Sequence, residues 1–321
     1  MAKLQSTEIV GVANRPATIC SNSVCIWFDT TNTKIVYSYC GYSGAGVWSA
    51  GGALITGRGY IKGAGTQNEA FVAGGYSNGQ LSCTEEYNGT SWSAGGALIT
   101  ARNGLIGAGT QNEGLVAGGA TSVSLSCTEE YNGTSWSVGG VLTNARGHSA
   151  GAGTQNAGLI MGGCITYIGI VSCTEEYNGT SWSTGGALAT SRYSLAGAGT
   201  QNEAFVAGGY TSAVVLCTEE YNGTSWSVGG ALITARQLLA GAGSQNAGVL
   251  IGGLVGVVVL CTEEYNGTSW SIGGTLITAR HGLAGAGSQV AGLVSGGFTN
   301  TTHISCTEEY NKPLAIIDCI K

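Results

Sequence analysis

The sequence predicts an all-β fold assembled from a repeated unit of about 44 residues. Six arginines mark the repeat at intervals of 44, 44, 46, 44 and 44 residues: Arg58, Arg102, Arg146, Arg192, Arg236 and Arg280. Six tryptophans keep the same spacing: Trp48, Trp92, Trp136, Trp182, Trp226 and Trp270. Each unit contains several short β-like segments, and one small sheet cannot bury both faces unless neighbouring sheets stack on it. The period is therefore typical of a β-propeller in which each unit forms one blade.

The composition agrees with this fold and excludes several others. Of 321 residues, 57 are glycine, 2 are proline and 9% are charged, which excludes a disordered charged chain, a collagen and a coiled coil. The net charge of −6 argues against a nucleic-acid or anionic-membrane partner, because a basic excess is needed to release counterions from phosphates. We find no apolar run of about 18 residues and no secretory pattern at the start, so we expect no membrane insertion. The eleven cysteines are then expected to be reduced, as in a host cytoplasm.

Within a unit, four strands are predicted at Leu105–Gly109, Gly114–Gly119, Leu125–Tyr131 and Ser135–Leu142. Asn132-Gly133 predicts a two-residue hairpin turn between the third and fourth strands, since both turn positions require a positive φ. The four strands then form an antiparallel meander.

The ordered landmarks of a unit resemble the kelch family. An apolar strand ends in Gly118-Gly119, and Tyr131, Trp136 and Arg146 follow in that order. The Gly-Gly pair recurs in the other units at Gly74-Gly75, Gly162-Gly163, Gly208-Gly209, Gly252-Gly253 and Gly296-Gly297. The resemblance covers residues 15–311 and implies a kelch-repeat β-propeller, of the near-identical-repeat type found in bacteriophage and environmental bacterial proteins.

Seven blades are predicted in a single domain, with six as the alternative. The blade units are expected at residues 15–57, 58–101, 102–145, 146–191, 192–235, 236–279 and 280–321, with residues 1–14 as an N-terminal closure segment. The first unit is atypical because Ile26-Trp27-Phe28 stands where Gly-Gly is expected, and the last lacks a tryptophan strand after Tyr310. Ring closure is expected near the termini, with Leu314–Ile320 or Glu8–Val12 supplying the last outer strand.

The differences between copies fall in two places, after each Gly-Gly pair and after each arginine. In an up-and-down blade both places emerge on the same side, so one face is predicted to be variable and suited to recognition, although neutral drift in tolerant loops is the alternative. Ile165–Val171 and Leu254–Leu260 are apolar, which indicates either a partner contact or longer buried strand ends. The predicted binding residues are Tyr60, Asn78, Asn103, His148, Tyr167, Tyr193, Gln237, His281 and His303.

The six arginines admit two interpretations. They could form a ring of guanidinium groups at the channel mouth that binds carboxylate, sulfate or phosphate. The structural interpretation, which we favour, pairs each arginine with a glutamate of the repeated Glu-Glu doublets, such as Glu129-Glu130, and so holds adjacent blades together. Neighbouring residues of a strand point to opposite faces, so a doublet is not a paired acid/base site.

Catalytic chemistry has little support in the sequence. Some kelch-like rings are copper oxidases acting on sugars, but the only three histidines, His148, His281 and His303, lie in separate units. The repeated cysteines, such as Cys127, are expected to be small buried hydrophobes, since adjacent blades hold them too far apart for disulfides. We therefore expect no enzyme, no catalytic residue, no metal and no cofactor.

The function predicted on this basis is non-enzymatic binding. The resemblance to bacteriophage proteins implies a virion- or tail-associated, adhesin-like protein, located in the virion after synthesis in a bacterial host. Its expected partners are other virion proteins or a host surface glycan or protein, and homo-oligomers are possible. A cytosolic (cytoplasmic) protein-interaction scaffold is the alternative, followed by a carbohydrate-active copper oxidase-like enzyme.

Overall fold

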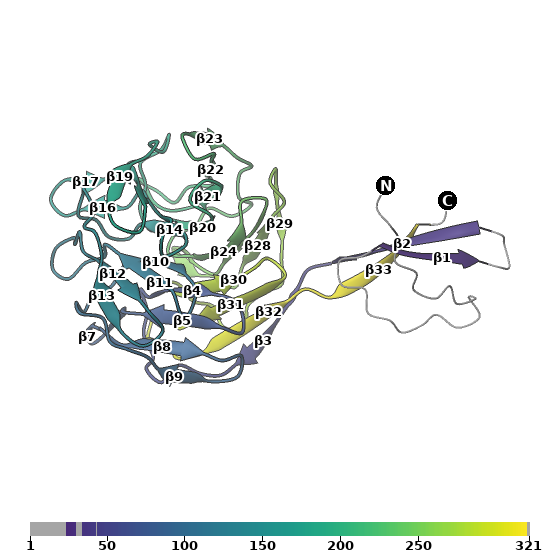
Figure 1. Ribbon diagram of the computed structural model, residues 1–321, viewed down its shortest axis with the longest axis horizontal. Coiled ribbons are helices and arrows are strands. Elements are labelled where there is room, and N and C mark those ends of the chain that lie inside the picture. The colour runs from purple at the N-terminus through teal and green to yellow at the C-terminus, as the bar shows by residue number, and fades with distance from the viewer. Residues whose placement is uncertain (1–23, 30–33, 43, 320–321) are drawn as a thin grey trace. The chain divides into compact units, whose positions relative to one another are not determined.

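The computed structural model describes residues 24–29, 34–42 and 44–319, and in this part of the chain it contains strands but no helix. The chain divides into two compact units. The larger unit, Gly46–Asn311, is a β-propeller of six four-stranded blades (Figure 1). The smaller unit draws on both ends of the chain.

The blades share one strand order. The first strands are β4 (Lys62–Gly65), β10 (Ile106–Gly109), β14 (Ala150–Gly153), β20 (Ala196–Gly199), β24 (Ala240–Ser244) and β30 (Ala284–Gly287). The second strands are β5 (Ala70–Ala73), β11 (Gly114–Ala117), β15 (Gly158–Met161), β21 (Ala204–Ala207), β25 (Ala247–Ile251) and β31 (Ala291–Ser295). The third strands are β8 (Thr84–Tyr87), β12 (Thr128–Tyr131), β18 (Thr174–Tyr177), β22 (Thr218–Tyr221), β28 (Thr262–Tyr265) and β32 (Thr307–Asn311). The fourth strands are β9 (Trp92–Ala94), β13 (Trp136–Val138), β19 (Trp182–Thr184), β23 (Trp226–Val228), β29 (Trp270–Ile272) and β3 (Val47–Gly51).

The first strands lie innermost, because each of them contacts the first strands of both neighbouring blades. All pairings within a blade are antiparallel, as the meander predicts. Three blades carry an additional short hairpin between their second and third strands. These hairpins are β6 (Tyr76–Ser77) with β7 (Gly79–Gln80), β16 (Cys164–Ile165) with β17 (Gly169–Ile170), and β26 (Leu254–Val255) with β27 (Val257–Val258).

The prediction of seven blades is wrong, and the six-blade alternative is correct. The expected first blade, residues 15–57, does not form, because its tryptophan strand β3 pairs with β32 and completes the last blade. Trp48 lies opposite Tyr310, in the same register as Trp136 opposite Tyr131. One strand from the N-terminal side and three from the C-terminal side thus make a single blade and close the ring.

The strand that was expected to close the ring from the C-terminal end belongs to the smaller unit. There β33 (Leu314–Cys319) pairs with β2 (Lys34–Tyr42), which pairs in turn with β1 (Val24–Asp29). The segment 26–28, expected to replace a Gly-Gly pair, lies in β1. Glu8–Val12, the other candidate for closure, lies outside the described residues.

The connection between third and fourth strands is longer than predicted. Tyr131 pairs with Trp136, so four residues form the loop, and only Gly133 among them has a positive φ, of 84°. The Asn132 side chain accepts hydrogen bonds from the backbone amides of the two residues before Trp136, at 3.0 and 2.9 Å. This side-chain capping replaces the tight turn, because it satisfies the loop amides without placing asparagine in the left-handed region.

The apolar core lies between adjacent blades. Phe71 of one blade packs with Leu105, Val116 and Trp136 of the next. Tyr131 and Trp136 have ring centroids 4.8 Å apart, and the indole N–H of each such tryptophan donates to a threonine of the preceding blade, as Trp136 does to Thr84 at 2.9 Å. This Trp–Thr hydrogen bond occurs at all six junctions between adjacent blades. The packing at these junctions accounts for the Tyr and Trp of every repeat.

The Gly-Gly pair sits where one blade meets the next. Gly118 and Gly119 have φ of 62° and 97°, a region that other residues avoid. A Cβ on Gly118 would lie 2.5 Å from the carbonyl oxygen of Arg146, and the Gly119 amide donates to that same oxygen at 2.9 Å. The close approach of the two backbones therefore accounts for the Gly-Gly pair at this place.

Candidate functional site

The segments that differ between copies lie on one face of the propeller, which we call the variable face. In each blade the residue after the arginine forms an antiparallel bridge with the residue after the Gly-Gly pair. These bridges are Gly59–Tyr76, Asn103–Ala120, Gly147–Cys164, Tyr193–Tyr210, Gln237–Leu254 and His281–Phe298. The near-identical turns adjoin one another elsewhere, as where Gly133 lies against Asn112. The contacts agree with the predicted one-sided distribution of differences.

The apolar loops of the variable face extend into solvent at their tips. Tyr167 is 94% exposed, Ile168 is 76% exposed and Val257 is 62% exposed. The sequence left two interpretations of these loops, buried strand ends or a partner contact. Only the half-buried residues on either side of the tips agree with buried strand ends. The exposed tips present apolar surface that a partner could cover.

A closed ring of backbone hydrogen bonds surrounds the propeller axis on this face. The second residue after each arginine donates its amide to the carbonyl of the equivalent residue in the preceding blade, at 2.7–3.0 Å. The ring residues are Tyr60, Gly104, His148, Ser194, Leu238 and Gly282. All six have φ between 54° and 61°, although four are not glycine. Non-glycine residues hold this conformation only where their surroundings impose it, and here the ring supplies that constraint.

Residues from all six blades line a cavity of about 30 Å³ at this ring, which we call the axial pocket. Its lining consists of the six ring residues together with Ile61, Lys62, Ser149, Leu195, Leu239 and Leu283. The His148 ring lies over Gly104, and the Tyr60 ring lies over Gly282. Two glycines of the ring thus leave room for the two aromatic side chains.

The electrostatics of the axial pocket are set by burial. Burial lowers the pKa of Lys62 to about 8. Burial also lowers the pKa of His148, and the charge of Lys62 lowers it further. Burial raises the pKa of Tyr60. At neutral pH the pocket therefore holds an ammonium group, a neutral imidazole and a neutral phenol.

The three histidines lie in separate repeat units, as the sequence indicates, but a series of aromatic contacts connects them. Tyr60 lies between His148 and His281, with ring centroids 6.2 and 5.9 Å away. Phe298 lies between His281 and His303, at 5.5 and 4.8 Å, and Tyr76 lies 5.8 Å from His303. Burial lowers the pKa of His281 and of His303, and His303 contributes to the shift at His281.

The remaining predicted residues lie on the variable face outside the axial pocket. Asn78 and Tyr167 are exposed, whereas Asn103, Tyr193 and Gln237 are partly exposed. Tyr193 packs edge-on against Tyr210, with ring centroids 5.7 Å apart. The structure therefore brings Tyr60 and His148 together in the pocket and distributes the others around it.

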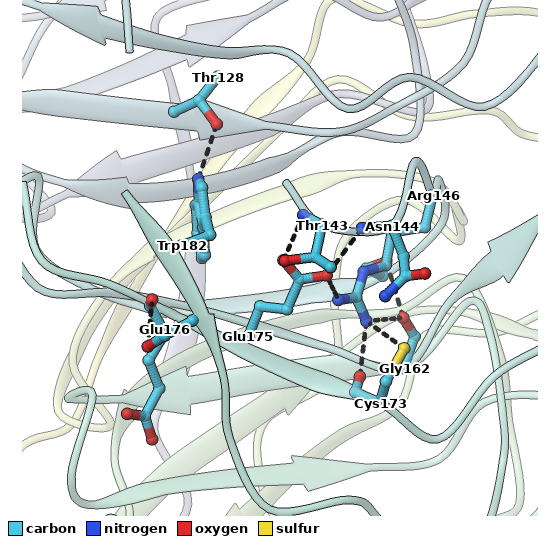
Figure 2. A network of polar contacts seen from close by, with 11 residues as sticks. Thr128, Thr143, Asn144, Arg146, Gly162, Cys173, Glu175, Glu176 and Trp182 are labelled. Atoms are coloured by element: carbon cyan, nitrogen blue, oxygen red, sulfur yellow. Dashed lines mark hydrogen bonds and ion pairs between the residues drawn. The ribbon is translucent and has the colours of Figure 1, made fainter. Parts of the chain in front are cut away.

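The six arginines are buried, and each forms an ion pair with the first glutamate of a doublet. Figure 2 shows Arg146 directed at Glu175, with Glu176 directed away from both. Glu175 also accepts hydrogen bonds from the backbone amides of Thr143 and Asn144, at 2.7 and 3.2 Å (Figure 2). These contacts support the predicted pairing of arginine with glutamate. Each pair joins the connection between two blades to the third strand of the blade that follows it, instead of joining the sheets of two adjacent blades. A ring of arginines open to an anionic ligand conflicts with the burial of all six.

The second glutamate of each doublet binds the next blade. Tyr131 donates its hydroxyl to Glu86 of the preceding blade at 2.5 Å. Equivalent bonds connect every pair of adjacent blades, including the pair at the closure, where Tyr87 donates to Glu309 at 2.6 Å. Burial raises the pKa of Tyr131 to about 12, and the bond to Glu86 contributes to this shift. Both glutamates of each doublet therefore have structural partners: the first pairs with an arginine and the second accepts a hydrogen bond from a tyrosine of the next blade.

Among the described residues, no three His, Cys, Asp or Glu side chains lie close enough together to hold a metal ion.

The repeated cysteines were predicted to be buried, and the structure differs from that prediction. Four of the six are half-buried, and Cys217 and Cys306 are exposed. The Cys173 sulfur accepts a hydrogen bond from Arg146 at 3.0 Å (Figure 2). Their place at the end of the arginine side chain explains why they are not buried among hydrophobes.

Three polar residues of the axial pocket were not among the predicted binding residues: Lys62, Ser149 and Ser194. Ser149 donates to the Gly162 carbonyl at 3.0 Å, whereas Lys62 occupies a strand position that is Ile106 or alanine in the other blades. The sequence feature that could have identified these three residues is that each differs from most equivalent residues of the other blades. They lie two to four residues after an arginine.

The geometry defines a β-propeller of repeated four-stranded blades, a fold that suggests a binding or scaffold role. No protein-family model matches the chain, and no curated protein matches it either. Within the described ranges, no helix has the length and apolar character needed to cross a membrane.

Proposed function

We propose that this chain is a non-enzymatic recognition protein that binds its partner through the variable face. The observation that carries the proposal is the pairing of the two variable segments in all six blades. Because the bridges keep the differing residues together, six dissimilar segments surround one axis while the contacts between blades stay constant. Loops on a rigid scaffold are the usual location of recognition.

The kind of partner is inferred from the exposed loop tips and from the repeat type. Tyr167 and Ile168 offer an apolar contact that charged surface loops would not provide. The near-identical repeats resemble those of bacteriophage proteins, which supports a virion- or tail-associated, adhesin-like role and a host surface glycan or protein as the target. The kelch character and the viral placement rest on this resemblance.

Exchanging one hairpin for another tests the variable face. Residues 164–170 are replaced by the five-residue sequence of residues 120–124, which connects the same strands in the neighbouring blade. The control is Glu203→Ala in a turn between first and second strands, where Ala157 occupies the equivalent place in another blade. Binding of labelled protein to a panel of bacterial cells and to a glycan array is measured. We expect at least a tenfold loss for the exchange and no change for the control.

Two further measurements test whether the chain belongs to a virion and whether it is a binding protein or an enzyme. Mass spectrometry of purified bacteriophage particles should detect the chain. The proposal fails if the chain is absent from particles and binds no cell surface, glycan or virion component. Stoichiometric copper in the purified protein would instead favour the oxidase-like alternative.

A further inference from the structure

We propose that the axial pocket binds the carboxylate group of a small organic acid, with the Lys62 ammonium as its counter-ion. The rest of the ligand then extends over the variable face. The inference deepens the proposed function, since both place the ligand on this face, and it names a chemical group that the sequence analysis did not identify.

The pocket gathers several positions at which one blade departs from the others. Four residues after the arginine, the other blades carry Ile106 or an alanine, and only the first blade carries a lysine, Lys62. Three residues after the arginine, Ser149 replaces leucine or isoleucine. At the ring position, Tyr60, His148 and Ser194 add three more polar side chains. These departures come from different blades and converge on one cavity.

The charge of the pocket is uncompensated. Its lining contains no Asp or Glu among the described residues, and in the same part of the chain the Lys62 side chain makes no ion pair or hydrogen bond with a protein group. The six buried arginines, by contrast, each have a glutamate partner. A half-buried cation without a counter-ion raises the free energy of the folded chain, and a ligand with a negative charge would reduce that cost.

The donors indicate a monoanion. The ring amides are already bonded to ring carbonyls, so a ligand must use side chains. Lys62 supplies one positive charge, the neutral His148 ring supplies one N–H, and Tyr60 and Ser194 supply hydroxyl groups. A single positive charge balances a carboxylate but not a phosphate dianion. A cavity of about 30 Å³ also admits only a group of a few atoms.

The direct test compares acetate with acetamide, which has the same shape without the charge. Titration of the full chain by isothermal calorimetry or NMR should show acetate binding at least tenfold more tightly than acetamide. Glucuronate against glucose repeats the comparison on a sugar. Tighter binding of glucuronate than of acetate would indicate an acidic sugar, and equal binding would indicate a simple organic acid; both support a carboxylate site.

Variants of the pocket locate the site. Lys62→Met keeps the length of the side chain, and Lys62→Ala introduces the residue that Ala150 and three further blades carry at this position, so at least one variant should fold. Both should lose tenfold or more in acetate affinity. Glu203→Ala, in a turn between first and second strands and outside the pocket lining, is the control and should bind acetate normally.

The pH dependence gives a second readout. Lys62 must be protonated to bind, and its pKa of about 8 predicts that acetate affinity falls as pH rises above that value. The other titratable groups of the lining are His148 and Tyr60, and their pKa values are shifted down and up respectively, away from this range. Lys62→Met should abolish the pH dependence above pH 8.

Equal affinity for acetate and acetamide, or unchanged acetate binding in Lys62→Met, overturns the inference. The two proposals fail separately. If Lys62→Met loses acetate but still binds cells or glycans, recognition lies in the outer loops and the carboxylate site stands. If the 164–170 exchange loses cell binding but retains acetate, the pocket is intact.

Discussion

Replacing Lys62 by methionine should stabilise the propeller at neutral pH. Methionine has a similar length and no charge, and equivalent positions in the other blades are apolar. Burial lowers the pKa of Lys62 from 10.5 to about 8, and each pKa unit corresponds to about 1.4 kcal/mol. The upper bound on the stabilisation is about 3.4 kcal/mol. Because Lys62 remains partly exposed, screening by solvent reduces the expected gain to about 1–3 kcal/mol.

The pH profile follows from the sign of the shift. Below pH 8, Lys62 is protonated in both the folded and the unfolded chain, and the folded chain bears the full cost of confining the charge. Between about pH 8 and 10.5 the folded chain releases its proton while the unfolded chain retains it, so the cost declines. The difference in stability between Lys62→Met and the wild type should therefore be largest near pH 7 and disappear above pH 10.5.

Equilibrium unfolding in urea, followed by tryptophan fluorescence and circular dichroism, measures this difference. Ile106→Met, at the equivalent strand position of the next blade, controls for the methionine side chain itself and should change stability by less than about 1.5 kcal/mol. Destabilisation by Lys62→Met, or a difference that does not vary between pH 7 and 10.5, would refute the view that the ammonium lacks a counter-ion in the free protein. Added acetate should narrow the difference, because it stabilises only the wild type.

Three further predictions concern the scaffold. Glu129→Gln should destabilise the protein by about 3–5 kcal/mol in urea unfolding, because it leaves the Arg102 guanidinium buried without its counter-charge. Tyr131→Phe should cost about 1–2 kcal/mol below pH 10 through the lost bond to Glu86; since the folded-state pKa of Tyr131 is raised to about 12, the difference should shrink as pH rises from 10 to 12. Asn132→Ala should cost about 1 kcal/mol, since two loop amides lose their acceptor, and hydrogen exchange should show faster exchange of those amides.

The spacing of the repeated arginines and tryptophans predicted the length of the repeat, but it did not predict the number of blades. The repeat predicted the strand order and the Arg–Glu pairs correctly, because each of those features lies within about one unit of sequence. Blade number depends on a long-range pairing, Trp48 with Tyr310. The sequence has one tryptophan strand without a complete blade before it and one tyrosine strand without a tryptophan after it. These two incomplete units together form one blade. The prediction counted each of them as a separate blade, which gave seven blades instead of six.

The axial pocket was only half predicted, for a related reason. Tyr60 and His148 stood out because they fall in the visibly variable segments. Lys62 lies within the first strand, between a variable position and the nearly constant Gly-Ala-Gly, and its significance appears only when its side chain is seen beside those of four other blades. Convergence on a rotational axis is a property of the closed ring, so no pattern within one unit reveals it.

The ring of backbone hydrogen bonds explains how such a pocket can vary without loss of the fold. Each ring residue contributes its amide and carbonyl to the closure, and these groups are present whatever the side chain. Glycine, serine, leucine, histidine and tyrosine all occupy the ring at nearly the same φ, so the scaffold accepts very different side chains there at the modest cost of the left-handed conformation. The blade contacts through Arg, Glu, Tyr and Trp lie outside the axial pocket and repeat unchanged. Stability is thus carried by the constant contacts between sheets, and the six axial positions are free to be selected for the ligand.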